Sequence, residues 1–166
     1  MSGQSDLLEQ IDFSQVYCLN EQSSHPITNT LKQGYREDDG LFLESDADEQ
    51  LLIFVPFSQK VKLHSLVLKA TDAAKAPKNI KLYVNKPSMG FSDCDAPGAQ
   101  ELELLPEELS KGEPITLKYV KFQSVHSLSI FIENNQDDEE TTILNKIGFI
   151  GTLVDTTNMK DLKKVG

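Results

Sequence analysis

Short runs that alternate apolar and polar residues recur along this chain, and they constrain its fold more than any other feature. In the segment 79–85, Ile80, Leu82 and Val84 fall on one face of an extended strand. The segments 115–122 and 127–133 alternate in the same way. Successive side chains of a strand point to opposite faces of a sheet, so each run offers one face to a core. The pattern predicts a chain built mostly of β-strands.

Two further stretches extend this prediction. The run QLLIFVPF (50–57) is apolar throughout and suits a strand that is buried on both faces. A polar turn is expected at 58–60, followed by a separate strand over 61–70. The apolar stretch 141–154 contains Gly148 and Gly151, which suggest a β-bulge or a close approach of two backbones.

Turn-rich loops separate these strands, and the PEELS segment (106–110) is the one convincing helix, with its proline at the first helical position. A chain of 166 residues has the usual size of one domain and can bury a sizeable core. Several short strands at this spacing predict an all-β protein with a jelly-roll β-sandwich.

The charge balance excludes two classes of partner. The chain has 26 acidic and 16 basic residues, and Arg36 is its one arginine. Proteins that bind nucleic acids need clustered lysine and arginine, and anionic membranes repel a chain of net charge −10. We therefore expect neither nucleic acid nor a membrane as partner. The first residues lack the basic start and apolar run of a signal peptide, so a cytoplasmic protein, also present in the nucleus, is expected.

The sequence offers no recognisable catalytic or metal-binding motif. His25, His64 and His126 are scattered and never lie at metal-ligand spacing from a cysteine or another histidine. The GxSxG, HExxH, GxGxxG and phosphate-loop motifs are absent. Cys18 and Cys94 lie far apart without a CxxC pair, so free thiols are expected. We predict a protein without enzymatic activity, catalytic residues, metal or cofactor.

Two acidic clusters are the best remaining candidates for a functional site. One follows the apolar residues 41–43, and the other precedes the last strand. Close carboxylates can hold Ca²⁺, but the first cluster lacks the glycine and the third carboxylate of an EF-hand loop. Solvated loop charge and the steering of a protein partner are the competing interpretations. The candidate interaction residues are Glu44, Asp46, Asp48, Glu49, Asp137, Asp138, Glu139 and Glu140.

Five strings of this chain resemble the PITH domain, which is named for a proteasome-interacting thioredoxin-like protein. They are CLNE (18–21), FLESDADEQLLIFVPFSQKVKLHSLVL (42–68), PKNIKLYVN (77–85), YVKFQSVHSLSIFI (119–132) and NQDDEETTILNKIGFIGT (135–152). The resemblance covers residues 7–164 in unbroken order, with 1–6 and 165–166 expected as flexible termini. No thioredoxin half and no CxxC accompany it, so the chain looks like a stand-alone PITH-domain protein.

The resemblance implies a sandwich similar to the galactose-binding-like fold and association with the regulatory particle of the proteasome. We therefore expect a monomeric, non-enzymatic interaction module whose partner is that particle or another protein assembly. The alternatives are a module that binds a small ligand or Ca²⁺ at the loop end of the jelly roll, and a redox-linked partner of separate thioredoxin-type proteins.

Overall fold

The computed structural model describes residues 5–32 and 40–154, and the strand pairings within these ranges are antiparallel. The strands are β1 (Ser5–Asp6), β2 (Tyr17–Leu19), β3 (Leu43–Glu44), β4 (Leu51–Lys69), β5 (Asn79–Val84), β6 (Gln100–Glu103), β7 (Pro114–Thr116), β8 (Val125–Ile132), β9 (Ile143–Leu144) and β10 (Lys146–Leu153). The α-helices are α1 (Thr28–Lys32) and α2 (Pro106–Lys111), and the 3₁₀ helices are η1 (Leu8–Gln10), η2 (Phe13–Gln15), η3 (Phe91–Asp95) and η4 (Tyr119–Lys121).

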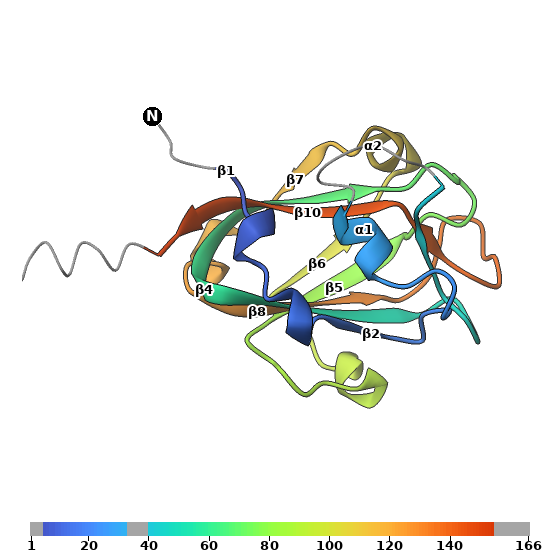
Figure 1. Cartoon of the computed structure of the whole chain (residues 1–166). Helices are drawn as coiled ribbons and strands as arrows, with labels where there is room; N and C mark the ends of the chain where they lie inside the picture. Colours follow the sequence, from blue (N-terminus) through green and yellow to red (C-terminus); the bar gives the residue numbers. More distant parts are fainter. Residues whose placement is uncertain (1–4, 33–39, 155–166) are drawn as a thin grey trace, which may run out of the picture.

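Strand β4 belongs to both layers of the sandwich. Its first half pairs with β2 and β8, and β8 continues to β5 and β6. Its second half pairs with β10 and β7, and β10 carries β1 on its far edge. Figure 1 shows β4 running along one layer, turning at one end of the molecule and returning in the other layer. The expected all-β sandwich is therefore confirmed.

The turn expected at 58–60 is replaced by a bend within the continuous strand β4. Ser58, Gln59 and Lys60 are exposed there, and the pairing with β8 shifts register between Pro56 and Val61. The three polar residues mark the point where the strand leaves one layer for the other. Because the corner is exposed, these polar residues stay in contact with water while the strand bends, and the chain forms no separate turn there.

Both faces of the first half of β4 are buried, as expected for the apolar run 50–57. Leu51, Ile53 and Val55 point into the core between the layers, where each is fully buried. On the opposite face, Leu52 packs in a smaller outer cluster with Tyr83, Cys94 and Phe131. Each fully buried aliphatic side chain contributes about 1.5–3 kcal/mol relative to exposure, so this strand anchors the fold.

The segment 115–122 is not the single strand that its alternation predicts. It forms the short strand β7 and then the 3₁₀ helix η4. Leu117 and Phe122 are buried, whereas the residues between them are exposed. The side chain of Gln100 accepts a hydrogen bond from Lys118 N (2.7 Å), which takes this amide away from the strand ladder.

The stretch 141–154 divides into two strands. Strand β9 pairs with β3 in a small separate sheet, and β10 pairs with β4 in the main sheet. The register shifts between Ile150 and Gly151, which confirms the bulge expected near the glycines.

The expected helix at 106–110 is confirmed as α2. Pro106 opens it, and Gly112 (φ 67°) ends it in the left-handed conformation.

The expected domain end at Lys164 and the terminus 165–166 lie outside the described residues, as do residues 1–4 of the expected N-terminal tail. Within 5–32 and 40–154, none of the helices is both long and apolar enough to cross a bilayer.

Candidate functional site

The fold brings the two acidic loops together at one end of the sandwich. Ser45 N donates a hydrogen bond to Thr142 O (3.0 Å), and Thr142 N donates to the hydroxyl of Ser45 (2.9 Å). The hydroxyl of Thr142 donates to the carbonyl of Glu49 (2.7 Å). Ser45 and Thr142 are fully buried, so these bonds are shielded from water. We call this region, residues 44–50 with 135–142, the acidic end.

Asn20 fixes the first acidic loop. Its side-chain amide donates to the carbonyl of Gln50 (2.7 Å) and to the carboxylate of Asp48 (2.8 Å), and its side-chain oxygen accepts from Ala47 N (3.0 Å). Its backbone has φ 74°, a left-handed conformation that asparagine tolerates better than most residues. One side chain therefore determines the shape of the turn that carries Asp46 and Asp48.

Asn135 has the same role in the second acidic loop. It is 3% exposed, and its amide donates to the carbonyls of Glu139 (3.0 Å) and Thr141 (3.1 Å) and to the hydroxyl of Thr142 (3.2 Å). Its oxygen accepts from Glu139 N (2.8 Å). These four bonds hold the loop closed and direct its carboxylates outward.

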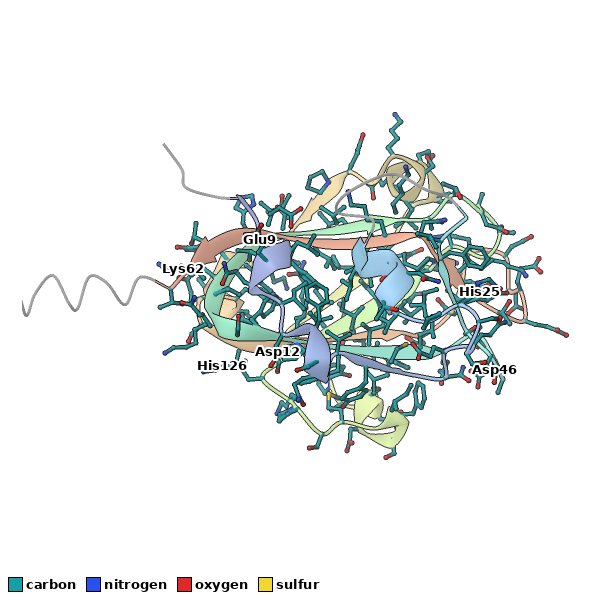
Figure 2. The ribbon with its side chains drawn as sticks, in the orientation of Figure 1. Glu9, Asp12, His25, Asp46, Lys62 and His126 are labelled. Atoms are coloured by element: carbon teal, nitrogen blue, oxygen red, sulfur yellow. The ribbon has the colours of Figure 1, made fainter. Side chains whose placement is uncertain are left out.

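Four carboxylates of the acidic end border a hollow of about 350 Å³, which is lined by Asp46, Ala47, Asp48, Glu49, Glu140 and Thr141. Asp46, Asp48, Asp137, Asp138 and Glu140 are exposed, whereas Glu49 and Glu139 are half-buried. Within the described ranges, no group of three or more His, Cys, Asp or Glu side chains is placed to hold a metal ion. Figure 2 shows Asp46 at this end of the sandwich, near His25.

Glu44 differs from the other candidate residues because its side chain points into the structure. Its carboxylate accepts a 2.7 Å hydrogen bond from the hydroxyl of Thr141 and lies 3.5 Å from the ammonium group of Lys75. The side chain of Glu44 is 14% exposed. Solvated loop charge, one of the two interpretations of the acidic clusters, therefore does not apply to Glu44, which joins β3 to the loops that carry Lys75 and Thr141. Asp48 is exposed but is also engaged by Asn20.

An aromatic pair adds apolar surface beside the acidic loops. The rings of His25 and Phe42 are stacked, with centroids 4.1 Å apart and an angle of 16° between their planes. The carbonyl of His25 accepts a hydrogen bond from Glu44 N (3.1 Å), which links the pair to β3. Both rings are half-buried, so the acidic end presents apolar as well as charged atoms.

Sequence reasoning missed the residues that shape this site. Asn20 and Asn135 occur within the CLNE and NQDDEETT strings, but nothing about an isolated asparagine shows which loop it holds. The proximity of Lys75 to Glu44 follows from the meeting of three loops, which no local pattern reveals.

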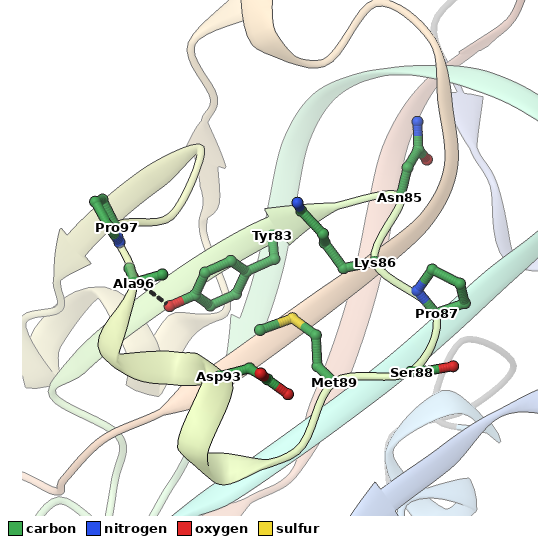
Figure 3. Close-up of a pocket in the computed structure, with 9 residues that line it drawn as sticks. All are labelled: Tyr83, Asn85, Lys86, Pro87, Ser88, Met89, Asp93, Ala96 and Pro97. Carbon is green, nitrogen blue, oxygen red and sulfur yellow. Dashed lines mark hydrogen bonds between the residues drawn. The ribbon is translucent and has the colours of Figure 1, made fainter.

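A second hollow, of about 450 Å³, lies between β5 and the loop that follows it. Figure 3 shows its lining, in which Lys86, Met89 and Asp93 lie around the ring of Tyr83. The hydroxyl of Tyr83 donates to the carbonyls of Ala96 (2.6 Å) and Cys94 (3.1 Å), so its proton is engaged within the protein. Burial is the main cause that raises the pKa of Tyr83 to about 12.

Both cysteines are free and buried. Cys18 belongs to the core between the layers, and Cys94 belongs to the outer cluster on the other face of the sheet. Burial, followed by the charge of Glu21, raises the pKa of Cys18 well above its ordinary value. Burial, followed by the charge of Asp93, raises the pKa of Cys94. Neither thiol has the environment of a reactive thiolate.

The fold is similar to that of solved sugar-binding modules. A family 32 carbohydrate-binding module from Clostridium perfringens, solved with galactose, matches with a TM-score of 0.64 and 7% identity, over 89% of this chain and 98% of the module. This likeness confirms the galactose-binding-like jelly roll expected from the sequence. At such low identity it concerns the fold alone.

Sequence relatives identify the family. Thioredoxin-like protein 1 of Schizosaccharomyces pombe is 36% identical over 99% of this chain, which spans 57% of that protein. PITH domain-containing protein 1 of Homo sapiens is 32% identical over 90% of this chain and 69% of the human protein. The family model described as the PITH domain matches residues 1–166. The chain therefore belongs to the PITH domain family.

Proposed function

We propose that this protein is a non-enzymatic interaction module whose acidic end docks on a basic surface of a larger protein assembly. The observation that carries the proposal is the convergence of two acidic loops into one surface with a fixed shape. Asn20 and Asn135 hold the loops through buried or half-buried hydrogen bonds, so docking requires little ordering of the backbone. The exposed carboxylates steer association, and apolar atoms such as those of Phe42 contribute to holding the partner.

The proteasome regulatory particle is the partner that we propose first, and the PITH family membership supports this choice. This role places the protein in the cytoplasm and nucleus, where two unpaired thiols are the ordinary state.

The experiment compares two variants of the tagged chain for binding to purified regulatory particle. The first variant, which we call the acidic-end variant, removes four exposed charges through Asp46→Asn, Asp137→Asn, Asp138→Asn and Glu140→Gln. It spares Glu44 and Asp48, because both have structural partners. The matched control neutralises the same number of exposed charges elsewhere, through Glu9→Gln, Glu103→Gln, Glu113→Gln and Glu133→Gln.

We expect the acidic-end variant to associate about tenfold more slowly at physiological salt, because charge complementarity acts mainly on the association rate. The control variant should associate like wild type, and both should melt close to it. Raising the salt should slow wild type towards the acidic-end variant, because exposed charges are already screened beyond about 8 Å at 0.15 M and more salt shortens this distance. Failure of wild type to bind the particle at any salt would exclude this partner, and an equal loss in both variants would exclude the site.

A second candidate function is the binding of a small polar ligand in the hollow beside Tyr83. Its volume of about 450 Å³ is sufficient for a small molecule, and Lys86, Ser88 and Asp93 provide polar groups at its rim. Galactose is a reasonable first probe, because it is the ligand named for a protein with this fold. Chemical shifts of Tyr83 and Met89 should move on titration with galactose if this function holds, and unchanged shifts at millimolar concentration would remove the sugar from consideration.

A further inference from the structure

At the bend of β4, opposite the acidic end, the chain forms a protruding loop that the acidic site does not use. We call residues 118–121 the knuckle. Leu117 N donates to the carbonyl of His64 (2.9 Å), and Leu63 N donates to the carbonyl of Phe122 (2.9 Å). The two ends of the knuckle are thus attached to adjacent residues of β4. The side chains of Leu117 and Phe122 are 4% and 0% exposed, which anchors both ends in the core.

Hydrogen bonds fix the conformation of the knuckle. Lys121 N donates to the carbonyl of Lys118 (2.9 Å), and Phe122 N donates to that of Tyr119 (3.0 Å). The side chain of Gln123 also donates to the carbonyl of Tyr119 (3.0 Å). Gln100, which is 7% exposed, holds Lys118 N from the neighbouring strand β6. The loop is therefore preorganised and exposes the same side chains before and after it meets a partner.

The two apolar side chains of the knuckle face solvent. Val120 is 79% exposed and Tyr119 is 57% exposed. A single exposed apolar residue is ordinary on a protein surface. Here two adjacent residues are held outward on a loop whose flanking residues are buried. Tyrosine in such a position is a frequent centre of protein interfaces, because its ring combines apolar area with a hydroxyl and few rotatable bonds.

The charge around the knuckle is opposite to that of the whole chain. Lys118 and Lys121 belong to it, and Lys60 and Lys62 lie on the adjoining part of β4. The segments 58–71 and 117–132 contain no acidic residue, although the net charge of the chain is −10. None of these four lysines forms an ion pair with a carboxylate of the described residues. Figure 2 shows Lys62 and His126 at the end of the sandwich that is distant from Asp46.

Two carboxylates on the strands of the main sheet are separated from the knuckle or already engaged. Asp6 lies in β1, and the strands β10 and β4 lie between β1 and β7, the strand that leads into the knuckle. Three strand spacings amount to about 14 Å, which exceeds the screening length of about 8 Å at physiological salt. Glu101 follows Gln100, but its carboxylate accepts a hydrogen bond from Gly98 N (3.2 Å). The two segments that form this surface, 58–71 and 117–132, therefore contribute positive charge alone.

We propose that the knuckle is a second docking surface, which binds an acidic segment of a partner protein that carries apolar side chains. Lys60, Lys62, Lys118 and Lys121 match the carboxylates of such a segment, and Tyr119 and Val120 match its apolar residues. A polyanion such as nucleic acid extends well past four lysines and meets the repulsion of a chain with net charge −10. An extended membrane surface meets the same repulsion. A short acidic segment experiences only the local positive field.

This surface is independent of the acidic end and lies at the other end of the sandwich. A domain with both surfaces can contact a basic partner at one end and an acidic partner at the other without competition. The second surface thus extends the proposed function from docking to bridging.

The test is an NMR titration of the isotope-labelled full chain with a short synthetic peptide of Asp and Glu residues around a central Leu-Phe pair. We expect the amide shifts of Lys62 and of residues 118–123 to move, and those of residues 44–50 to stay. A peptide with Ser in place of Leu and Phe should bind about tenfold more weakly, and one with Gln and Asn in place of the acids should bind weakly as well. Parallel titrations use vesicles containing phosphatidylserine and a short DNA duplex.

Two variants locate the binding. Each variant carries two substitutions in the knuckle and should weaken peptide binding about tenfold or more. One combines Tyr119→Ser with Val120→Ser, and the other combines Lys118→Glu with Lys121→Glu. Leu105→Ser and Lys111→Glu are the matched controls, because both residues are exposed and lie at α2. The acidic-end variant described above should bind the peptide as wild type does, so this proposal and the proposed function can fail separately.

Three outcomes would overturn the proposal. They are an absence of shifts at the knuckle with the acidic peptide, equal binding by the knuckle variants, and knuckle shifts that appear with vesicles or DNA but not with the peptide. Association of the chain with itself through the knuckle, detected by concentration-dependent shifts, would identify a second copy as the acidic partner in place of a separate protein.

Discussion

Thr141 donates a 2.7 Å hydrogen bond from its hydroxyl to the carboxylate of Glu44, and this bond joins segments 97 residues apart. Lys75 approaches the same carboxylate to 3.5 Å from a third loop. The acidic end is therefore held together partly by one of its own acidic residues. Its carboxylates have two different roles, since Glu44 supports the surface and neighbours such as Asp46 form it.

Replacement of these two residues should separate the roles. We expect Glu44→Ala to lower the free energy of unfolding by about 1–2 kcal/mol, because the Thr141 hydroxyl loses its acceptor and Lys75 loses its partner. Asp46→Ala should change it by less than about 0.5 kcal/mol, because the side chain is exposed. Urea unfolding followed by circular dichroism measures both values. Equal losses would show that the inward orientation of Glu44 has no energetic consequence.

Asn135 should matter more for stability than any carboxylate of the acidic end. Asn135→Ala leaves the carbonyls of Glu139 and Thr141 and the amide of Glu139 without their partner in a buried setting. We expect a loss of about 2–3 kcal/mol in the free energy of unfolding, together with faster hydrogen exchange of residues 137–142. Asn135→Asp keeps the acceptor but places a buried carboxylate against the carbonyls of Glu139 and Thr141, so its loss should be at least as large as that of Asn135→Ala. A small effect of Asn135→Ala would mean that the loop closes without these hydrogen bonds.

The sequence predicts the main strands of this fold because their periodicity is set by burial on one or both faces, as in β5 and β8. The same rule fails at 115–122, where the alternation continues although the backbone leaves the ladder. In an extended strand Leu117 and Phe122 would point to opposite faces, whereas η4 between them lets both enter the same core, and the side chain of Gln100 takes the amide of Lys118. A local pattern carries no information about a partner on another strand.

The candidate site was predictable in its residue types but not in its assembly. Carboxylates in two loops are visible in the sequence, whereas the β3–β9 pairing that unites them is two residues long and lacks a periodic signal. The orientation of Glu44 follows from Thr141 and Lys75, which are far from it in the chain. Long-range contacts of this kind depend on the completed fold.

The bulge at Gly151 makes this position much less tolerant than Gly148. A Cβ added at Gly151 would collide with the carbonyl oxygen of Lys62, which is backbone and cannot move away freely. At Gly148 the nearest atom is the Cβ of Val67, at 3.4 Å, which is close to ordinary contact. We expect Gly151→Ala to cost about 3 kcal/mol or more in the free energy of unfolding, and Gly148→Ala less than about 1 kcal/mol. Similar costs for both would show that β10 adjusts its path at the bulge.

The native thiols should react slowly with disulfide reagents. Burial raises the pKa of Cys18 and that of Cys94, so few thiolates form near neutral pH. We expect the coloured reaction with Ellman's reagent to take hours in buffer and to finish rapidly in urea. An insulin-reduction assay should show no turnover above background. Immediate labelling of one thiol in the native protein would show that its burial opens readily, and Cys18→Ala and Cys94→Ala would identify which.

Stability should fall in alkaline solution, and Tyr83 should account for part of the loss. The ordinary pKa of a tyrosine hydroxyl is 10.0, and in the folded protein burial is the main cause that raises the pKa of Tyr83 to about 12. The unfolded chain thus releases this proton at lower pH than the folded chain does. The contribution of Tyr83 is complete below pH 10 and is lost as the pH rises through about 12. The raised pKa values of the two thiols act in the same direction, beginning near pH 9.0.

Tyr83→Phe tests this directly, because it removes the ionisable hydroxyl and keeps the ring. At neutral pH the variant should be less stable than wild type by about 1 kcal/mol, because the hydroxyl no longer donates to the carbonyls of Cys94 and Ala96. As the pH rises from 10 to 12, the stability of wild type should fall more steeply, so the difference between the two proteins should shrink. Urea unfolding at intervals across this range measures the difference. If the two proteins lose stability in parallel, the hydroxyl of Tyr83 ionises equally in the folded and unfolded chains, and its raised pKa is wrong.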